Sequence, residues 1–162
     1  MDKTNKSRIG IVILAAGASV RLGKPKQLLQ FQRKSLIRRA AENSLATGCE
    51  NVAVVLGANA EKIKKEIENL PLEIVINENW QNGMSSSIKT GLEKLSEIQP
   101  NLSAVILMLC DQPFVDAEMI LRLIKTRRET QKMIAASDYK NTTGVPAIFS
   151  REMFEELLNL QG

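Results

Sequence analysis

Short apolar runs alternate with longer amphipathic stretches along this chain of 162 residues. The runs predict strands, and the run at 9–14 is apolar on both faces, which predicts a strand buried inside a sheet. They cover 9–14, 51–56, 72–76, 103–109, 132–136 and 145–149. The amphipathic stretches repeat apolar residues at helical spacing and predict helices. These cover 35–47, 60–70, 85–95, 116–129 and 151–160.

This alternation predicts an α/β fold, a three-layer sandwich in which a mostly parallel sheet has helices on both faces. We find no repeat or linker, and the length suits one domain, so we expect residues 1–162 to form a single domain. Gly48 is expected to end the first helix, and Asp116 to cap a later one. Ligands of such sheets bind beyond the carboxyl ends of the strands, which directs attention to the loops after Leu14, Ile76 and Leu109.

Composition then excludes several classes of function. There is no histidine, which excludes a histidine-activated nucleophile and a histidine-liganded zinc. Cys49 and Cys110 are far apart and show no metal-binding spacing, and Cys110 lies in an apolar run typical of a reduced thiol. The net charge of +4 forms no basic stripe with interleaved aromatics, so we expect no nucleic-acid partner.

Location is predicted from the same composition. No apolar run reaches the roughly 18 residues of a membrane span, so no membrane partner is expected. The first eight residues are polar and lack the apolar core of an export signal. We therefore predict a cytoplasmic protein.

The first of the three loops, LAAGASVRLGKPKQLL (14–29), combines a bare backbone with cations. The small side chains of 15–17 let a ligand approach the backbone closely. Arg21, Lys24 and Lys26 supply positive charge for phosphates. The loop is neither a Walker A motif nor the GxGxxG fingerprint. The alternative interpretation is a glycine-containing turn with solvated lysines.

The second loop, NENWQNGMSSSI (77–88), precedes a predicted helix. Gly83 allows a sharp turn, and the serines at 85–87 are candidates to cap that helix. A helix N-terminus with free N–H groups and hydroxyls suits a base edge, a ribose or a phosphate. The alternative is a plain helix cap, with Trp80 as a packing residue.

The third loop, CDQP (110–113), places the carboxylate of Asp111 at the end of the most apolar strand. Burying a carboxylate without a partner is costly, which favours a bound divalent cation. Mg²⁺ characteristically takes one or two carboxylates together with phosphate oxygens. The alternative is an aspartate that caps the following turn.

In this order the patterns LAAGxSxRxGxxK, NxxWxxGMxxSI and DQP resemble the molybdenum cofactor cytidylyltransferase family, within the MobA-like NTP transferase superfamily. The resemblance extends from about Ile11 to Phe149. It implies a Rossmann-like fold and a Mg²⁺-dependent transfer of CMP from CTP to a phosphorylated acceptor, molybdopterin, with release of pyrophosphate. A molybdenum hydroxylase is the protein partner that it implies.

The resemblance also implies a role for individual residues. Ala16 indicates cytidine, because the related guanylyltransferases carry LAGG instead of LAAG. Arg21, Lys26 and Asp111 are the implied catalytic residues, with the first two on the triphosphate and Asp111 on Mg²⁺. The implied nucleotide-binding residues are Leu14, Ala15, Ala16, Gly17, Arg21, Gly23, Lys26, Gly83 and Ser87.

Two departures from the family pattern lie near the end of the chain. Gly144-Val145-Pro146 stands where many relatives carry GHP, in a segment expected on the acceptor side. Relatives also continue into a GDxGAR-like segment with a second acidic metal ligand, whereas this sequence ends at Gly162. We therefore expect residues 1–162 to bind CTP weakly and to turn over little or not at all. We also expect self-association through apolar surface that the segment would cover.

Other functions remain open. A cytidylyltransferase for 2-C-methyl-D-erythritol 4-phosphate shares the PKQ sequence found at Pro25-Lys26-Gln27. A sugar-1-phosphate nucleotidyltransferase would show a longer GxGxR loop. A non-catalytic module could instead bind nucleotide, or pass molybdenum cofactor to a hydroxylase.

Overall fold

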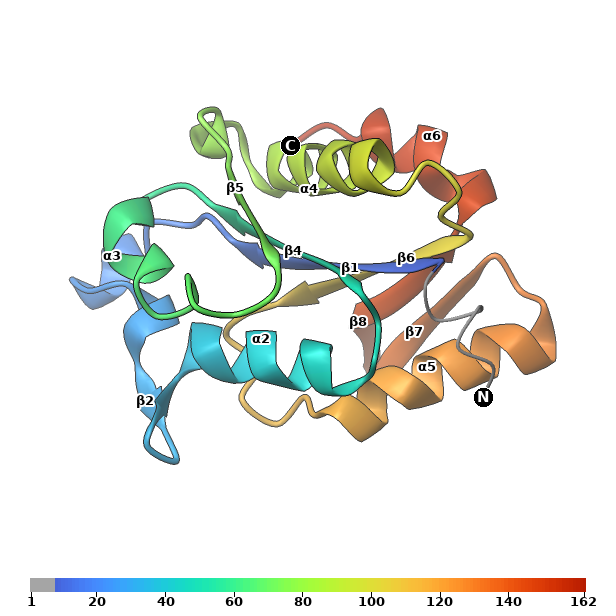
Figure 1. The fold of residues 1–162 in the computed structure, drawn as a ribbon, viewed down its shortest axis with the longest axis horizontal. Coiled ribbons are helices and arrows are strands. Elements are labelled where there is room, and N and C mark those ends of the chain that lie inside the picture. The colour runs from blue at the N-terminus through green and yellow to red at the C-terminus, as the bar shows by residue number, and fades with distance from the viewer. Residues whose placement is uncertain (1–7) are drawn as a thin grey trace.

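The computed structural model describes residues 8–162 and is built around a six-stranded sheet of order β5-β4-β1-β6-β8-β7 (Figure 1). The pairings β5–β4, β4–β1 and β1–β6 are parallel, and β8 is antiparallel to both β6 and β7. The predicted Rossmann-like, mostly parallel sheet is confirmed. Its strands are β1 (Ile9–Ala15), β4 (Asn51–Leu56), β5 (Glu73–Ile76), β6 (Ala104–Leu109), β7 (Ile134–Tyr139) and β8 (Thr142–Ser150).

Helices cover both faces of the sheet (Figure 1). One layer holds α2 (Leu36–Ala46) and α5 (Ala117–Thr130), and the opposite layer holds α4 (Met84–Ile98) and α6 (Phe154–Leu158), while α3 (Ala60–Lys64) lies beside β4. The 3₁₀ helices are η1 (Val20–Leu22), η2 (Lys26–Leu28), η3 (Trp80–Asn82) and η4 (Arg151–Met153). Within residues 8–162, none of the helices has the length and apolar character needed to cross a membrane.

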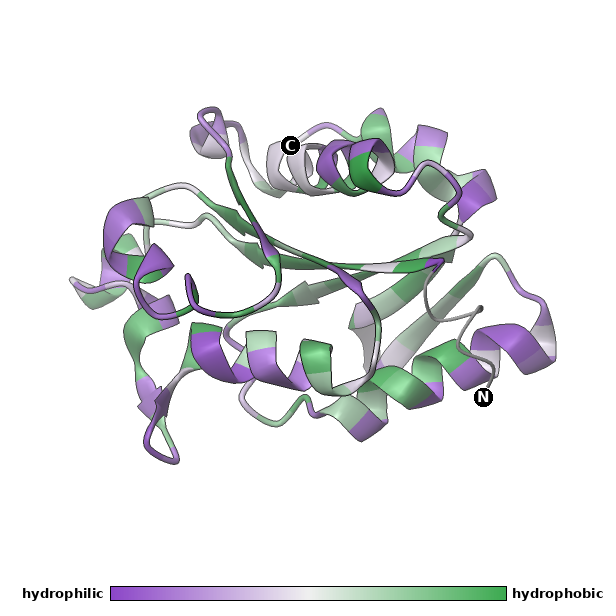
Figure 2. Ribbon diagram, viewed as in Figure 1, coloured by the Kyte–Doolittle hydropathy of each residue, from purple (hydrophilic) through white to green (hydrophobic). Residues whose placement is uncertain are grey.

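Strand β1 forms the centre of the core because every one of its residues is buried. Its side chains alternate, so that Ile11 and Ile13 pack with the α2 and α5 layer and Val12 packs with α4. Figure 2 shows the same arrangement, with apolar colour along the strands and on parts of the helices. Helix α4 approaches the sheet closely at Gly91, where a Cβ atom would lie 2.5 Å from Cγ1 of Val12.

Several predicted helix ends are confirmed. The side chain of Asp116 accepts a hydrogen bond from the backbone N–H of Met119 at 2.8 Å, as expected of an N-cap. After α2, Gly48 adopts a left-handed conformation with φ of 78°, which ends the helix.

Two helices are shorter than predicted. The helix expected over 60–70 ends at Lys64, and the chain continues in turns in which Glu66 and Ile67 donate to the carbonyls three residues earlier. These turns keep Ile67 fully buried, so the apolar spacing that predicted a helix reflects core packing. The segment 151–160 is divided between η4 and the short α6.

The sequence pattern missed a small hairpin of β2 (Gln30–Phe31) and β3 (Lys34–Ser35). Each strand has two residues, too few for a periodic pattern, and the turn uses Gln32 and Arg33 at positive φ where glycine or asparagine would normally signal it. Strands β7 and β8 also extend beyond the predicted apolar ranges. The hydrophobic pattern missed the added residues because most of them are polar and exposed.

The order of the strands creates one point where ligands are expected. From β1 the chain proceeds to β4 and β5 on one side, and then crosses back to β6 on the other side of β1. Helix α2 follows β1 in one layer and α4 follows β5 in the other, so loops leave the carboxyl ends of the parallel strands toward both faces, which is where ligands of such sheets bind.

Candidate active site

A cavity of about 420 Å³ lies beyond the carboxyl ends of β1 and β6. All three loops selected from the sequence contribute to it. Its lining residues are Leu14, Ala15, Ala16, Gly17, Ser19, Lys26, Gln27, Trp80, Gln81, Gly83, Met84, Ser87, Leu109, Cys110 and Asp111. Eight of the ten predicted site residues are thus brought together around one volume.

From the end of β1 into the following turn, the four backbone carbonyls of residues 14–17 are all held by protein donors. The pairs are Leu14 with the Cys110 N–H at 3.3 Å, Ala16 with the Ala58 N–H at 3.0 Å, and Ala15 and Gly17 with the Gln27 side chain at 2.8 and 2.9 Å. Among residues 8–162, by contrast, no protein acceptor pairs with the N–H groups of Gly17 and Ala18. Free N–H groups next to occupied carbonyls favour an anionic ligand.

Lys26 and Asp111 meet at this cavity from different loops. The Nζ of Lys26 lies 3.8 Å from the Oδ2 of Asp111, and their side chains are 47% and 37% exposed. An exposed pair at this distance stabilises a fold by at most about 1 kcal/mol. Folding stability therefore does not account for the position of either charge, whereas a ligand containing phosphate and metal would.

The second loop forms the wall next to α4. Gly83 turns the chain with φ of 97°, a conformation that disfavours other residues. The Oγ of buried Ser87 accepts from the side chain of Asn77 at 3.0 Å, which leaves its hydroxyl proton free to donate. The expected serine cap is wrong, because Gly83 is the N-cap of α4 and Ser86 donates to the Gly83 carbonyl at 2.8 Å.

Trp80 both lines the cavity and packs against the core. Its position depends on Gly57, where a Cβ atom would lie 2.6 Å from the Cβ of Trp80 and 2.8 Å from the Ala16 carbonyl oxygen. Trp80 is therefore a packing residue, as the alternative interpretation predicted, and also part of the cavity wall.

Cys110 lines the cavity but does not offer a nucleophile. Burial, with a smaller effect from the Asp111 charge, raises the pKa of its thiol to about 12. The thiol stays protonated at neutral pH, and a protonated thiol is a poor nucleophile and metal ligand.

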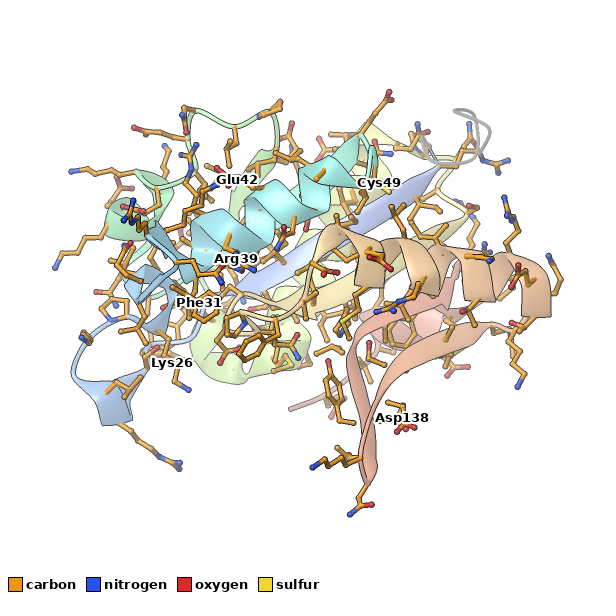
Figure 3. All side chains as sticks on the ribbon, turned by 90° about the horizontal axis from the view of Figure 1, so that it is seen from below. Lys26, Phe31, Arg39, Glu42, Cys49 and Asp138 are labelled. Carbon is orange, nitrogen blue, oxygen red and sulfur yellow. The ribbon has the colours of Figure 1, made fainter. Side chains whose placement is uncertain are left out.

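Two predicted residues, Arg21 and Gly23, lie outside the lining of the cavity. They belong to η1 and its end, where Ser19 and Gly23 both adopt left-handed conformations and the segment is exposed. Their assignment to the nucleotide remains a prediction. Lys26 reaches the cavity from the next turn and lies beyond the carboxyl end of β1 (Figure 3).

Several residues that line the cavity were not predicted as site residues from the sequence. Gln27 is the most informative of these, because it is 3% exposed and bonds to two carbonyls of the turn. The signal that could have identified it is the PKQ sequence at 25–27, which the cytidylyltransferase for methylerythritol phosphate shares. The others are Ser19, Gln81, Met84, Leu109 and Cys110.

Within residues 8–162, no group of three or more histidine, cysteine, aspartate or glutamate side chains is placed to hold a metal ion. Asp111 is the carboxylate at the cavity. One carboxylate with water and phosphate oxygens is a usual set of ligands for Mg²⁺ bound with a nucleotide.

Residues 11–162 match the sequence profile of the MobA-like NTP transferase domain. Among curated proteins, nicotine blue oxidoreductase of Paenarthrobacter nicotinovorans is 37% identical over 129 residues, which are 79% of this chain and 61% of that protein. The chain thus spans less than two thirds of this relative's length.

Solved structures give a consistent comparison. The crystal structure of the Rv0371c homolog from Mycobacterium sp. strain JC1 is 35% identical, with a TM-score of 0.83 over 96% of this chain and 76% of that one. Rv0371c of Mycobacterium tuberculosis H37Rv in complex with manganese is 27% identical, with a TM-score of 0.80 over 96% and 77%. With a profile match across all but the first ten residues, the chain belongs to the family of MobA-like NTP transferase domains.

Proposed function

We propose that this nucleotidyltransferase-family domain transfers CMP from CTP to a phosphorylated acceptor, molybdopterin or molybdenum cofactor, and releases pyrophosphate. The observation that carries the proposal is the meeting of Lys26, Asp111 and the turn at 15–17 around one cavity. Membership of the family supports nucleotidyl transfer. The proposal further specifies CTP as the nucleotide, Mg²⁺ as the metal and molybdopterin or molybdenum cofactor as the acceptor.

In the proposed reaction, an oxygen of the acceptor phosphate attacks the α-phosphorus of CTP. The bond between that phosphorus and the oxygen bridging to the β-phosphate breaks, and pyrophosphate leaves. Lys26 offers its ammonium to the triphosphate, and the N–H of Gly17 is free to donate to an anionic oxygen. Catalysis then rests mainly on positioning and charge stabilisation, since little acid–base work is needed.

The residues present fit a divalent metal. Asp111 supplies a hard oxygen ligand that is partly exposed and open to ions from solvent. The manganese complex of Rv0371c supports divalent metal use among relatives. Bound there, Mg²⁺ would supply positive charge to the phosphate oxygens.

CTP is proposed as the nucleotide because of Ala16. This residue is the second alanine of LAAG, whereas the related guanylyltransferases carry glycine there, in LAGG. Ala16 is 6% exposed and lines the cavity, so its methyl group helps to define the space for a base. A glycine at this position would leave more room.

The wider setting is proposed on the same basis. Residues 1–162 are taken as one nucleotidyltransferase domain acting in the cytoplasm, where the buried thiols of Cys49 and Cys110 stay reduced. The partners proposed are CTP, the acceptor and a molybdenum hydroxylase, with no nucleic acid and no membrane. Self-association of the chain is also proposed.

A second candidate comes from the relative named nicotine blue oxidoreductase. An oxidoreductase needs an electron donor, and the sequence contains no GxGxxG fingerprint for a dinucleotide. The methylerythritol phosphate enzyme and the non-catalytic binding module are the remaining alternatives. The proposed reaction is favoured over the module because Asp111 and Lys26 meet at the cavity.

The deciding experiment measures pyrophosphate release with CTP, GTP, UTP and ATP against molybdopterin and methylerythritol phosphate, each with Mg²⁺. Release with CTP and molybdopterin that is lost in Asp111→Asn supports the proposal. Nucleotide binding without release would instead support the binding module. Oxidation of a reduced nicotinamide cofactor in the presence of a dye, with no release of pyrophosphate, would favour the oxidoreductase.

A further inference from the structure

A glutamine directly follows each member of the Lys26–Asp111 pair, and Gln27 is buried whereas Gln112 is half-buried. Gln27 donates from Nε2 to the carbonyl oxygens of Ala15 and Gly17 at 2.8 and 2.9 Å. Gln112 donates from Nε2 to the carbonyl oxygen of Val145, in β8, at 2.8 Å. In the part of the chain that the structure describes, the Oε1 atoms of both glutamines are buried without a hydrogen-bond partner.

The orientation of the Gln27 carboxamide is fixed by chemistry. Its two partners are carbonyl oxygens, which only accept, so the nitrogen must face them and the oxygen must face away. A buried acceptor without a partner opposes folding, and an apolar side chain of similar shape would avoid that cost. The presence of glutamine at 27 is therefore explained by what its nitrogen holds.

Through these two hydrogen bonds, the Nε2 of Gln27 holds the first part of the turn at 15–19. A second contact holds its end, because the backbone N–H of Lys26 donates to the Oγ of Ser19 at 3.1 Å. Lys26 and Gln27 both belong to η2, so one short helix fixes the turn and carries the ammonium that faces Asp111. The turn and the charge are thus held in one arrangement.

We propose that Gln27 is a positioning residue for the nucleotide. Its carboxamide nitrogen binds the carbonyls of Ala15 and Gly17, and this keeps the N–H of Gly17 free for the ligand and Lys26 in place beside it. This inference rests on the proposed function, since it takes the ligand of the turn to be a nucleotide.

The test uses Gln27→Met, which keeps the length of the side chain and removes the donor. The matched control is Gln112→Met, which removes the same group from a half-buried glutamine outside the cavity lining. Titration calorimetry with CTP and Mg²⁺ should show affinity at least about tenfold weaker for Gln27→Met. The control should bind as wild type does, and an equal affinity for wild type and Gln27→Met would overturn the inference.

Amide hydrogen exchange of the free protein provides a readout that needs no ligand. Peptides covering residues 14–19 should exchange faster in Gln27→Met than in wild type or Gln112→Met, and unchanged exchange would also overturn the inference. If wild type binds no nucleotide, the proposed function fails, and the exchange result still decides whether Gln27 holds the turn.

Gln27→Glu adds a pH signature that a purely structural role would not give. A carboxylate cannot donate to the two carbonyls, whereas a carboxylic acid can donate to one of them. The affinity of this variant for CTP, relative to wild type at the same pH, should therefore improve as the pH falls. A ratio that is independent of pH would contradict the role of Nε2 as donor.

Discussion

The ammonium of Lys26 lies 3.8 Å from the Oδ2 of Asp111, although the two residues come from loops that follow different strands, β1 and β6. In the free protein each group partly neutralises the other. A metal–nucleotide complex offers both of them a stronger partner, since phosphates attract the ammonium and a cation attracts the carboxylate. The five predictions below start from this arrangement and from the walls around it.

Asp111→Asn should abolish metal-dependent turnover and leave the protein folded, because asparagine keeps the shape of aspartate and lacks its charge. The measurements are pyrophosphate release and Mn²⁺ binding in the presence of CTP. Asp138→Asn is the matched control, since Asp138 lies exposed on β7, in the hairpin that Figure 3 shows extending from the molecule. Retained turnover in Asp111→Asn would remove the metal role.

Lys26→Ala should weaken binding of CTP by about 1.5–3 kcal/mol, the usual contribution of a hydrogen bond to a charged group. Binding of cytidine should change little, because cytidine has no phosphate. Lys24→Ala is the control, since Lys24 is exposed and outside the cavity lining. Equal losses for the two variants, measured by calorimetry, would indicate a diffuse basic loop.

CTP with Mg²⁺ should stabilise the fold more than GTP with Mg²⁺, because Ala16 limits the space for the base. At a concentration of 100 times the dissociation constant, the added stability is about 2.7 kcal/mol. Thermal unfolding with each nucleotide measures the difference, and Ala16→Gly should reduce it. Identical shifts with CTP and GTP would defeat the assignment of the base and leave the family unaffected.

Gly57→Ala should destabilise the fold by about 1–3 kcal/mol, the usual cost of adding volume to a packed site. The added Cβ would lie 2.6 Å from the Cβ of Trp80 and 2.8 Å from the Ala16 carbonyl, so both walls of the cavity must move. Gly17→Ala is the control, because a Cβ there meets no atom within 4 Å. Urea unfolding compares the two, and a stable Gly57→Ala would show that Trp80 moves freely.

The contribution of Glu42 to stability should depend on pH. Its carboxylate accepts from Lys34 and Arg38, and the hydrogen bond from Lys34 is the main cause that holds the pKa of Glu42 below its usual value of 4.5. A lowered pKa stabilises the fold above about pH 4.5, and that stability is lost as the pH falls through the folded value. The difference in unfolding free energy between wild type and Glu42→Gln should therefore shrink in acid. A difference that does not vary with pH would contradict this.

The hydrophobic pattern predicted the layers of this fold and the loops that line the cavity. Runs such as 9–14 and 52–56 are short, β-branched and apolar on both faces, which favours buried strands of a covered sheet. Such parallel strands place their following loops at one edge, so the sequence predicts that 14–17 and Asp111 lie in the same region. Helix ends at Gly48 and Asp116 were predictable because caps depend on neighbouring residues.

Which side chains in those loops meet depends on the three-dimensional fold. Lys26 and Arg21 carry the same charge in the same loop, yet Lys26 lines the cavity and Arg21 does not, because left-handed residues at Ser19 and Gly23 flank the exposed η1 segment that carries Arg21. The contacts of Gln27 with the turn and of Gly57 with Trp80 likewise connect segments that no local pattern relates. Periodicity and capping act over a few residues, whereas these contacts depend on how whole strands and loops come together in space.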